Sequence, residues 1–467
     1  MALENTHYGA ACIKEMLRNC RNIYFLGIGG INMSSLAHIT HTRGYRVGGS
    51  DRTLSKLTER LAGEGIEIFE GHDGKNISSY DALVYTVAVS SDNPEYLCAK
   101  ERGIPCISRA DYMGYIMTEY KTRIGISGMH GKSTCTSMCA EVLMAADTDP
   151  TVLSGAELAS MDGAWRIGKK ENFLFEACEY MDSFLDFNPN IAVILNIEMD
   201  HVDYFKSMEQ IRESYGRFAS IAGKHGACVV NADDGDVMEA VKNFEGKRIT
   251  FGINSKNADI RAENIRIENG RYCFSILKYG EVYCNAELCV TGYHNIYNAL
   301  ATAAVAYLCG LDGKAVAKGL SAFRGAKRRM EYKGEYNGAS LYDDYAHHPT
   351  EVRATLKGAK EMTRGRLFCV FQSHTYSRTS ALFDDFADAL RIADKVIVAK
   401  IYAAREVNTF GVSEEKLAEA VGNGAVAAES FSCAAELLKR ELRENDVAIV
   451  MGAGDVWHVF DHIKTEK

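Results

Sequence analysis

The sequence lacks the features that mark a membrane protein or a nucleic-acid-binding protein. Its longest helix-like apolar run, residues 297–308, is too short to cross a bilayer. No basic block stands out, and the formal net charge is −9. The first residues, MALEN, lack the basic-then-apolar pattern of a secretory signal. We therefore expect a cytoplasmic protein that binds neither nucleic acid nor membrane.

The cysteines do not form the pattern of a zinc site or of a disulfide framework. The 14 cysteines are scattered, several of them in apolar runs (Cys228, Cys289 and Cys369), and no CxxC pair has a partner pair. In a large chain without a signal peptide this favours reduced, mostly buried thiols.

Length and pattern predict several α/β domains. A chain of 467 residues is too long for one core, and 47% apolar with 25% charged residues is ordinary for a globular protein. Short apolar strands alternate with helical periodicity, which predicts mostly parallel sheets. We expect Rossmann-like domains at 1–120 and 325–467, around a central phosphate-loop (P-loop) ATPase domain at 121–324. Within the central domain, residues 259–290 read as β-rich, with hairpin turns at Asn269-Gly270 and Tyr279-Gly280.

The stretch at residues 124–134, IGISGMHGKST, has the character of a phosphate loop. An apolar strand leads into glycines, Gly-Lys-Ser and a helix, so that backbone N–H groups, a helix N-terminus and Lys132 meet an anion. Ser133 is placed to hold a Mg²⁺ ion that bridges phosphates. The spacing departs from G-x-x-x-x-G-K-[ST], because Ile126 occupies the position of the first glycine. We expect Gly125 to end the strand.

A second glycine turn lies near the N-terminus, at residues 27–30. A strand precedes it, a helix follows it, and Asp51 stands about twenty residues later, where dinucleotide-binding folds place an acid on a ribose. Asn32 occupies the position of the third glycine of G-x-G-x-x-G. The residues therefore leave two ligands open, a redox dinucleotide and another nucleotide diphosphate.

Acidic residues follow two predicted strands of the central segment. Glu176 and Glu179 come after strand 173–175, while Glu198 and Asp200 come after strand 191–196. Carboxylates at the C-terminal ends of parallel strands are expected metal ligands, and the alternative is that they cap helix N-termini. Their occurrence beside a Gly-Lys-Ser loop favours a Mg-nucleotide site.

Several motifs, in this order, resemble those of the Mur ligases of peptidoglycan synthesis. The resemblance covers nearly the whole chain and rests on GIGGINM (27–33), GMHGKST (128–134), NIEMDHVD (196–203), GYHNIYN (292–298), DDYAHHPTE (343–351), YAAREVN (402–408) and GAGD (452–455). It implies an N-terminal domain for a UDP-sugar, a central ATPase, and a C-terminal domain that helps to hold ATP and the incoming amino acid.

The resemblance is strongest to the member that attaches L-alanine to UDP-N-acetylmuramate. It implies an ATP-dependent amide ligase, in which ATP phosphorylates the lactyl carboxylate and the amine of L-alanine then displaces phosphate. ATP and Mg²⁺ are the implied cofactors, and the expected assembly is a monomer or weak homodimer. The first glycine turn would then bind the UDP-sugar.

The resemblance also implies site residues. Those implied for ATP are Gly128, Met129, His130, Gly131, Lys132, Ser133, Thr134, Asn295, Asn298, Arg328 and Asp344. Those implied for the UDP-sugar are Gly27, Gly29, Gly30, Ile31, Asn32, Ser50, Asp51, His72 and Thr86. The implied metal ligands are Ser133, Glu176 and His201, and the implied catalytic residues are Lys132, His201, His348 and Arg378. A second role for His201, as a hydrogen-bonding neighbour of the metal site, stays open.

Three positions depart from the family pattern, and three other functions compete. Met129 replaces a usual threonine, Cys178 a usual aspartate, and Thr375 an arginine found in many relatives, which bears on amino-acid specificity. One alternative is the family's recycling ligase, which attaches a tripeptide to the same sugar nucleotide. The others are a nicotinamide-dependent oxidoreductase and a non-catalytic, ATP-gated sensor of the sugar nucleotide.

Overall fold

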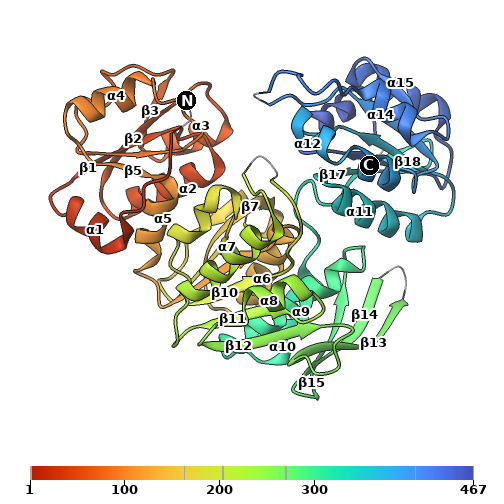
Figure 1. Ribbon diagram of the computed structural model, residues 1–467, viewed down its shortest axis with the longest axis horizontal. Coiled ribbons are helices and arrows are strands. Elements are labelled where there is room, and N and C mark those ends of the chain that lie inside the picture. The colour runs from red at the N-terminus through yellow and green to blue at the C-terminus, as the bar shows by residue number, and fades with distance from the viewer. Residues whose placement is uncertain (1–2, 162, 202–203, 269–270, 405, 466–467) are drawn as a thin grey trace.

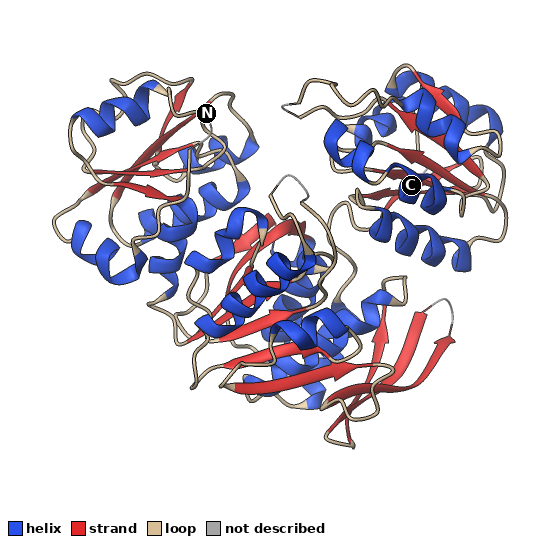
Figure 2. Ribbon diagram, viewed as in Figure 1, coloured by secondary structure: helices blue, strands red, loops and turns tan. Residues whose placement is uncertain are grey.

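The chain folds around three separate β-sheets. The structure is a computed structural model that describes residues 3–161, 163–201, 204–268, 271–404 and 406–465. The sheets follow one another along the chain, with helices beside each of them (Figures 1 and 2). This is the α/β architecture that the sequence predicts.

The first sheet is entirely parallel, with strand order β3-β2-β1-β4-β5. In β1, Ile23 and Phe25 join one apolar core while Tyr24 and Leu26 join another, so both faces of the strand are buried. That explains its unbroken apolar sequence. The elements are α1 (Gly9–Met16), β1 (Asn22–Leu26), α2 (Ile31–Thr42), β2 (Arg46–Asp51), α3 (Lys56–Gly63), β3 (Glu67–Glu70), β4 (Ala82–Tyr85), α4 (Pro94–Glu101), β5 (Cys106–Ser108) and α5 (Arg109–Met117).

The second sheet has ten strands in the order β15-β14-β13-β12-β11-β10-β6-β9-β7-β8. Its first half comprises β6 (Thr122–Ser127), α6 (Lys132–Ala145), β7 (Thr151–Leu158), η1 (Ala159–Met161), β8 (Gly163–Arg166), β9 (Asn172–Glu176), η2 (Tyr180–Asp186), β10 (Ile191–Ile194), α7 (Met208–Ile221), β11 (Ala227–Asn231), α8 (Gly235–Ala240) and β12 (Lys247–Gly252). Strands β13 (Ile260–Glu268), β14 (Arg271–Lys278) and β15 (Glu281–Leu288) form the predicted β-rich part, followed by α9 (His294–Leu308) and α10 (Gly313–Ala322). This β-rich part continues the central sheet, because β13 pairs with β12.

The third sheet has the order β16-β17-β21-β18-β19-β20 and is parallel except for β16 against β17. Its elements are β16 (Glu331–Tyr336), β17 (Ala339–Asp344), α11 (Pro349–Met362), β18 (Leu367–Phe371), α12 (Tyr376–Ala381), α13 (Phe383–Leu390), β19 (Lys395–Ala399), α14 (Glu414–Val421), β20 (Val426–Ala428), α15 (Phe431–Glu441), β21 (Val447–Met451) and η3 (Val456–His462).

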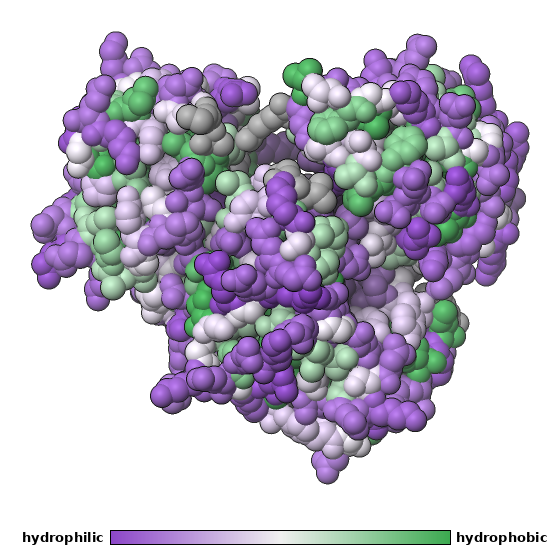
Figure 3. Space-filling model, in the orientation of Figure 1, coloured by the Kyte–Doolittle hydropathy of each residue, from purple (hydrophilic) through white to green (hydrophobic). Residues whose placement is uncertain are grey.

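Side-chain contacts join the second sheet to its neighbours on both sides. We call each sheet together with the helices beside it a unit. Trp165 of β8 packs against the ring of His38 (centroids 4.5 Å apart) and the guanidinium of Arg60 (4.4 Å), both from the first unit. The hydroxyl of Tyr272 in β14 donates a 2.8 Å hydrogen bond to Glu361 of α11. Between the first and third units the surface is hollowed, as the upper edge of Figure 3 shows.

One strand end differs from the prediction. Strand β6 continues past Gly125 to Ser127. Gly125 lies inside the strand because it pairs with Phe175 of β9 and Ala192 of β10, and a Cβ there would come within 2.7 Å of the Phe175 ring. The predicted turn at Asn269-Gly270 lies outside the described residues.

The thiols and helices agree with what the composition indicates. All 14 cysteines are free, and only Cys12 and Cys433 are exposed. Among the described residues, no helix combines the length and the apolar character needed to span a bilayer.

Candidate functional site

The phosphate loop lies at the C-terminal end of β6, in the middle of the second sheet. Gly131 has φ +83°, a left-handed conformation that favours glycine, and it is the N-cap of α6. The loop is fastened by Asn196, whose Oδ1 accepts the N–H of His130 at 2.8 Å and whose Nδ2 donates to the carbonyl of His130 at 2.9 Å. The loop amides are therefore held beside the helix N-terminus, where an anion is stabilised.

Lys132 forms a largely buried ion pair. Its Nζ lies 3.0 Å from Oε2 of Glu179, a residue with no exposed surface, and donates to the Gly128 carbonyl at 2.6 Å. Burial opposes charge on Lys132, but the carboxylate of Glu179 outweighs it and raises the lysine pKa. Nε2 of His201 lies 3.1 Å from Oε1 of the same carboxylate. Lys132 and His201 thus contact the same buried carboxylate beside the loop.

Ser133 and Glu176 offer an oxygen pair of the kind a hard cation prefers. Ser133 Oγ donates to Glu176 Oε2 at 2.8 Å, and the N–H of Gly155 donates to the same oxygen at 3.0 Å. Mg²⁺ favours oxygen ligands, so these two residues fit it. The imidazole of His201, the third predicted ligand, contacts Glu179 and offers nitrogen, which suits Mg²⁺ less well.

Cys178, at the position where the family usually has aspartate, carries no charge at neutral pH. Burial and the neighbouring Glu179 carboxylate raise the pKa of its thiol to about 11. The segment therefore holds one negative charge fewer beside Lys132 than an aspartate would give it.

A pocket opens beside the loop, between the second and third sheets. Its lining includes six of the residues that the family resemblance implies for ATP, namely His130, Gly131, Thr134, Asn295, Asn298 and Asp344. Asn298 and Asn295 lie on one buried face of α9, where Asn298 Nδ2 donates to Asn295 Oδ1 at 3.0 Å. Met129, a residue of the loop itself, is buried and donates its N–H to the Asn196 carbonyl at 3.3 Å.

Arg328 lies outside the pocket lining, while its neighbour Arg329 is part of it. The Arg328 guanidinium donates to the carbonyls of Gly452 (2.5 Å) and Gly454 (3.2 Å) and sits 5.0 Å from the ring of Tyr345. It thus ties the predicted Gly-rich turn at the end of β21 to the start of the third unit.

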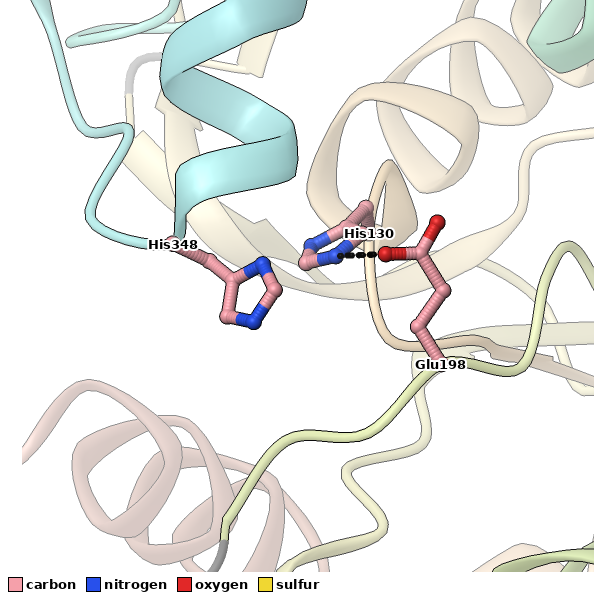
Figure 4. A group of neighbouring side chains, drawn as sticks. All are labelled: His130, Glu198 and His348. Atoms are coloured by element: carbon pink, nitrogen blue, oxygen red, sulfur yellow. Dashed lines mark ion pairs between the residues drawn. The ribbon is translucent and has the colours of Figure 1, made fainter. Parts of the chain in front are cut away.

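His130, Glu198 and His348 converge where the second and third units meet (Figure 4). His130 belongs to the phosphate loop, Glu198 follows β10, and His348 is the N-cap of α11. Burial acts to lower the pKa of His130, but Glu198 (3.4 Å) and Glu351 (3.2 Å) together raise it to about 9. Burial and the charge of His130 lower the pKa of His348.

Arg378 of α12 reaches back to the central sheet. Its Nη2 donates to Oδ1 of Asp200 at 3.0 Å, and only 12% of the arginine side chain is exposed. Although burial opposes ionisation, Arg378 holds the pKa of Asp200 well below its usual range. Thr375, the uncharged residue that departs from the family pattern, is the N-cap of α12. Arg405 and residues 202–203 of the quoted motifs lie outside the described residues.

Three residues of this region have a left-handed backbone conformation. His201, Arg328 and Thr375 have φ of +49°, +58° and +68°. Non-glycine residues rarely adopt such angles, and they persist where surrounding contacts hold them.

A second pocket lies at the first glycine turn, lined among others by Gly27, Gly30, Asp51, His72 and Thr86. Asp51 accepts the N–H of Gly29 at 2.8 Å, so its carboxylate braces the turn. Ile31 and Asn32 open α2 and are exposed at this edge of the first sheet.

Glu95 supports the second pocket through buried hydrogen bonds, and the sequence did not point to it. It is fully buried, and it accepts hydrogen bonds from Tyr24 (2.7 Å), Ser50 (2.5 Å) and Asn76 (2.8 Å), with His72 at 3.1 Å. Asn93, the N-cap of α4, was the available local signal, because its side chain accepts the N–H of Glu95.

The sequence also matches known protein families. The family described as "Mur ligase family, catalytic domain" matches residues 22–121, "Mur ligase middle domain" matches 126–306, and "Mur ligase, glutamate ligase domain" matches 328–454. A protein of Clostridium novyi named UDP-N-acetylmuramate–L-alanine ligase is 45% identical over 94% of this chain and 96% of its own. A protein of the same name from Acetivibrio thermocellus is 44% identical over 96% of each chain.

Solved structures agree with these matches. UDP-N-acetylmuramate–alanine ligase from Thermotoga maritima has a TM-score of 0.78 and 29% identity, over 94% of this chain and 97% of that chain. A murein peptide ligase from Psychrobacter arcticus shares the fold, with a TM-score of 0.69 at 22% identity. Three consecutive family matches and full-length relatives above 40% identity lead to one conclusion: the chain belongs to the Mur ligase family.

Proposed function

We propose that this protein is an ATP-dependent ligase that joins L-alanine to UDP-N-acetylmuramate in peptidoglycan precursor synthesis. The observation that carries the proposal is the end-to-end match to relatives of that name, with 94–96% of both chains covered. The phosphate loop with its buried Lys132 supports an ATP-consuming reaction. The glycine turn at 27–30 supports binding of the UDP-sugar, and nothing in it requires hydride chemistry.

The phosphoryl-transfer step would take place at the phosphate loop. A lactyl carboxylate oxygen attacks the γ-phosphorus, and the bond between the γ-phosphorus and the β-phosphate oxygen breaks. The products are ADP and an acyl phosphate. Both reactants are anionic, so the charge of Lys132 and the loop amides lower the cost of their approach. Ser133 and Glu176 would hold Mg²⁺, which supplies further positive charge to the phosphates. Glu179 keeps Lys132 charged and in place, and His201 contacts the same carboxylate.

The amide-forming step would draw on the third unit. The amine of L-alanine attacks the acyl carbon, loses a proton, and phosphate leaves from the tetrahedral intermediate. Arg378 is suited to the carboxylate of the amino acid, because a guanidinium can grip a carboxylate through two hydrogen bonds. Without substrates, its contact with Asp200 holds it at the edge of the central sheet. His348, neutral because of its lowered pKa, is placed to orient the amine or the acyl phosphate.

The remaining assignments belong to the same proposal. Asn295, Asn298 and Asp344 would contact ATP from the pocket lining, with Arg329 beside them and Arg328 supporting the turn at 452–454. The residues around Asp51, His72 and Thr86 would hold the UDP-sugar. We propose domain boundaries at 120/121 and 324/325, a cytoplasmic location, and a monomer or weak homodimer.

The test is ADP release with matched substrate pairs. The protein should release ADP with UDP-N-acetylmuramate and L-alanine, and much more slowly when a murein tripeptide replaces L-alanine. Activity with the tripeptide alone would assign the chain to the recycling reaction instead. Tight binding of both nucleotides without turnover would leave only a sensor.

A further inference from the structure

The contact between the second and third units contains a group of metal-binding side chains apart from the Ser133–Glu176 oxygen pair. One ligand atom each from His130, Glu198 and His348 lie within 4.8 Å of one another. Figure 4 shows His130 between the other two, with Glu198 on one side and the ring of His348 on the other. We call these three residues the two-histidine cluster.

The cluster has buried nitrogen atoms that make no hydrogen bond of good geometry. Nε2 of His348 has no partner among the described residues, while the two ring nitrogens of His130 face carboxylate oxygens at 3.2 and 3.4 Å, outside hydrogen-bond geometry. His348 is 5% exposed, and its ring centroid lies 4.9 Å from that of His130. Buried polar atoms are normally paired, so such a group points to a ligand that would satisfy them.

A second layer of residues supports the cluster. Oε1 of Glu351 lies 3.2 Å from Nδ1 of His130, while Nε2 of the same ring faces Glu198 at 3.4 Å. A carboxylate behind a ligating histidine, which fixes the tautomer and the ring orientation, is a regular feature of metal sites. The hydroxyl of Thr350 donates to Oε2 of Glu198 at 2.7 Å and so orients the ligating carboxylate as well.

We propose that the two-histidine cluster binds one divalent transition-metal ion of the zinc class. Two imidazoles and one carboxylate are a ligand set used for Zn²⁺, with a fourth position for water. Two ligands held about 2.1 Å from a tetrahedral zinc ion lie about 3.4 Å apart, which is the separation of His130 and Glu198. Mg²⁺ prefers oxygen throughout, so this cluster and the Ser133–Glu176 pair select different ions.

The bound ion would act as an inhibitory clamp. His130 lies in the phosphate loop and His348 begins α11, so one ion bridging them fastens the third unit against the loop. It also withdraws both histidines from substrates. The two carboxylates that stabilise positive charge on His130, Glu198 and Glu351, would stabilise the charge of the ion as well. Zn²⁺ should therefore inhibit turnover in the presence of excess Mg²⁺.

The test measures binding without substrates, so its outcome is independent of the proposed ligase activity. Chelator-treated full-length protein is titrated with Zn²⁺ by calorimetry in excess Mg²⁺, and with Co²⁺ by visible absorption. We expect one ion per chain and a Co²⁺ spectrum of nitrogen and oxygen ligands without a sulfur-to-cobalt band. His348→Ala and Glu198→Gln should each weaken binding by at least about 100-fold, and Glu351→Ala by about 10- to 100-fold.

Matched controls address the other groups that bind zinc. The double variant Cys12→Ser/Cys433→Ser removes the two exposed thiols, and His225→Ala removes an exposed histidine elsewhere; both should bind as the parent does. Circular dichroism of the metal-free variants checks their folding, and the two ligand variants are independent of each other. Binding that survives both His348→Ala and Glu198→Gln, or that disappears with the surface thiols, would overturn the proposal. So would the absence of tight binding in the parent protein.

Discussion

Replacing Lys132 by methionine separates the two consequences of its charge. Lys132 lies 3.0 Å from Glu179, which has no exposed surface, so Lys132→Met leaves a buried carboxylate without its cation. Breaking a buried pair in this way costs about 3–5 kcal/mol. His201 remains 3.1 Å from that carboxylate, so we expect the lower end of the range. A domain of 150–250 residues loses about 2–4 °C of Tm per kcal/mol of stability, so the Tm should fall by roughly 6–12 °C.

The catalytic loss should be separable from the loss of stability. Removing a cation that stabilises a transferring phosphoryl group costs roughly 10³- to 10⁵-fold in turnover. In the double variant Lys132→Met/Glu179→Gln the buried charge is gone, so we expect Tm to return to within a few degrees of the parent while turnover stays lost. The assays are calorimetric unfolding and ADP release, with titration of the UDP-sugar as a control that neither variant should affect. A double variant as unstable as the single one, or one that regains turnover, would refute this reasoning.

Three further changes test other parts of the structure. Burial raises the pKa of Asp186 from 3.8 to about 6, so the folded state favours the protonated carboxyl. The protonated carboxyl therefore stabilises the fold fully below pH 3.8, and this contribution is lost as the pH rises through 6. Asp186→Asn should therefore raise the free energy of unfolding at pH 8 by at most about 3 kcal/mol, and with it the Tm. At pH 4 it should change both little, and equal shifts in Tm at the two pH values would contradict this. Gly131→Ala should raise the KM for ATP about tenfold or more, because φ is +83° and the new Cβ would lie 2.8 Å from Asn298 Oδ1; an unchanged KM would place ATP elsewhere. Arg378→Ala should raise the KM for L-alanine by roughly 10- to 100-fold with that for ATP nearly constant, and the reverse pattern would assign Arg378 to the nucleotide.

Features encoded by neighbouring residues could be read from the sequence. The phosphate loop was predictable because a buried strand, two glycines with positive φ and a helix N-terminus follow one another within a few residues. That Asn295 and Asn298 share one face of α9 was predictable as well, since residues three apart on a helix lie side by side. Alternating strands and helices were enough to predict the α/β class.

Pairs made across the fold could not be read in this way. Arg378 and Asp200 are 178 residues apart, and the contact depends on how the third unit sits against the second. The same is true of His130 with Glu351, and of Glu95 beneath the first glycine turn. Gly125 was misplaced because its close partner, Phe175, lies on a neighbouring strand. Family resemblance named His348 and Arg378, but their partners emerged only from the structure.

The central claim is that ATP activates the sugar carboxylate for attack by L-alanine, and an oxygen-transfer experiment tests it most directly. UDP-N-acetylmuramate carrying ¹⁸O in its lactyl carboxylate is incubated with ATP, Mg²⁺, L-alanine and the protein. The released phosphate is then examined by ³¹P NMR or mass spectrometry. An acyl phosphate predicts one carboxylate ¹⁸O in each phosphate released, with the other ¹⁸O retained in the amide product. Phosphate free of ¹⁸O, with amide formed, would contradict the account.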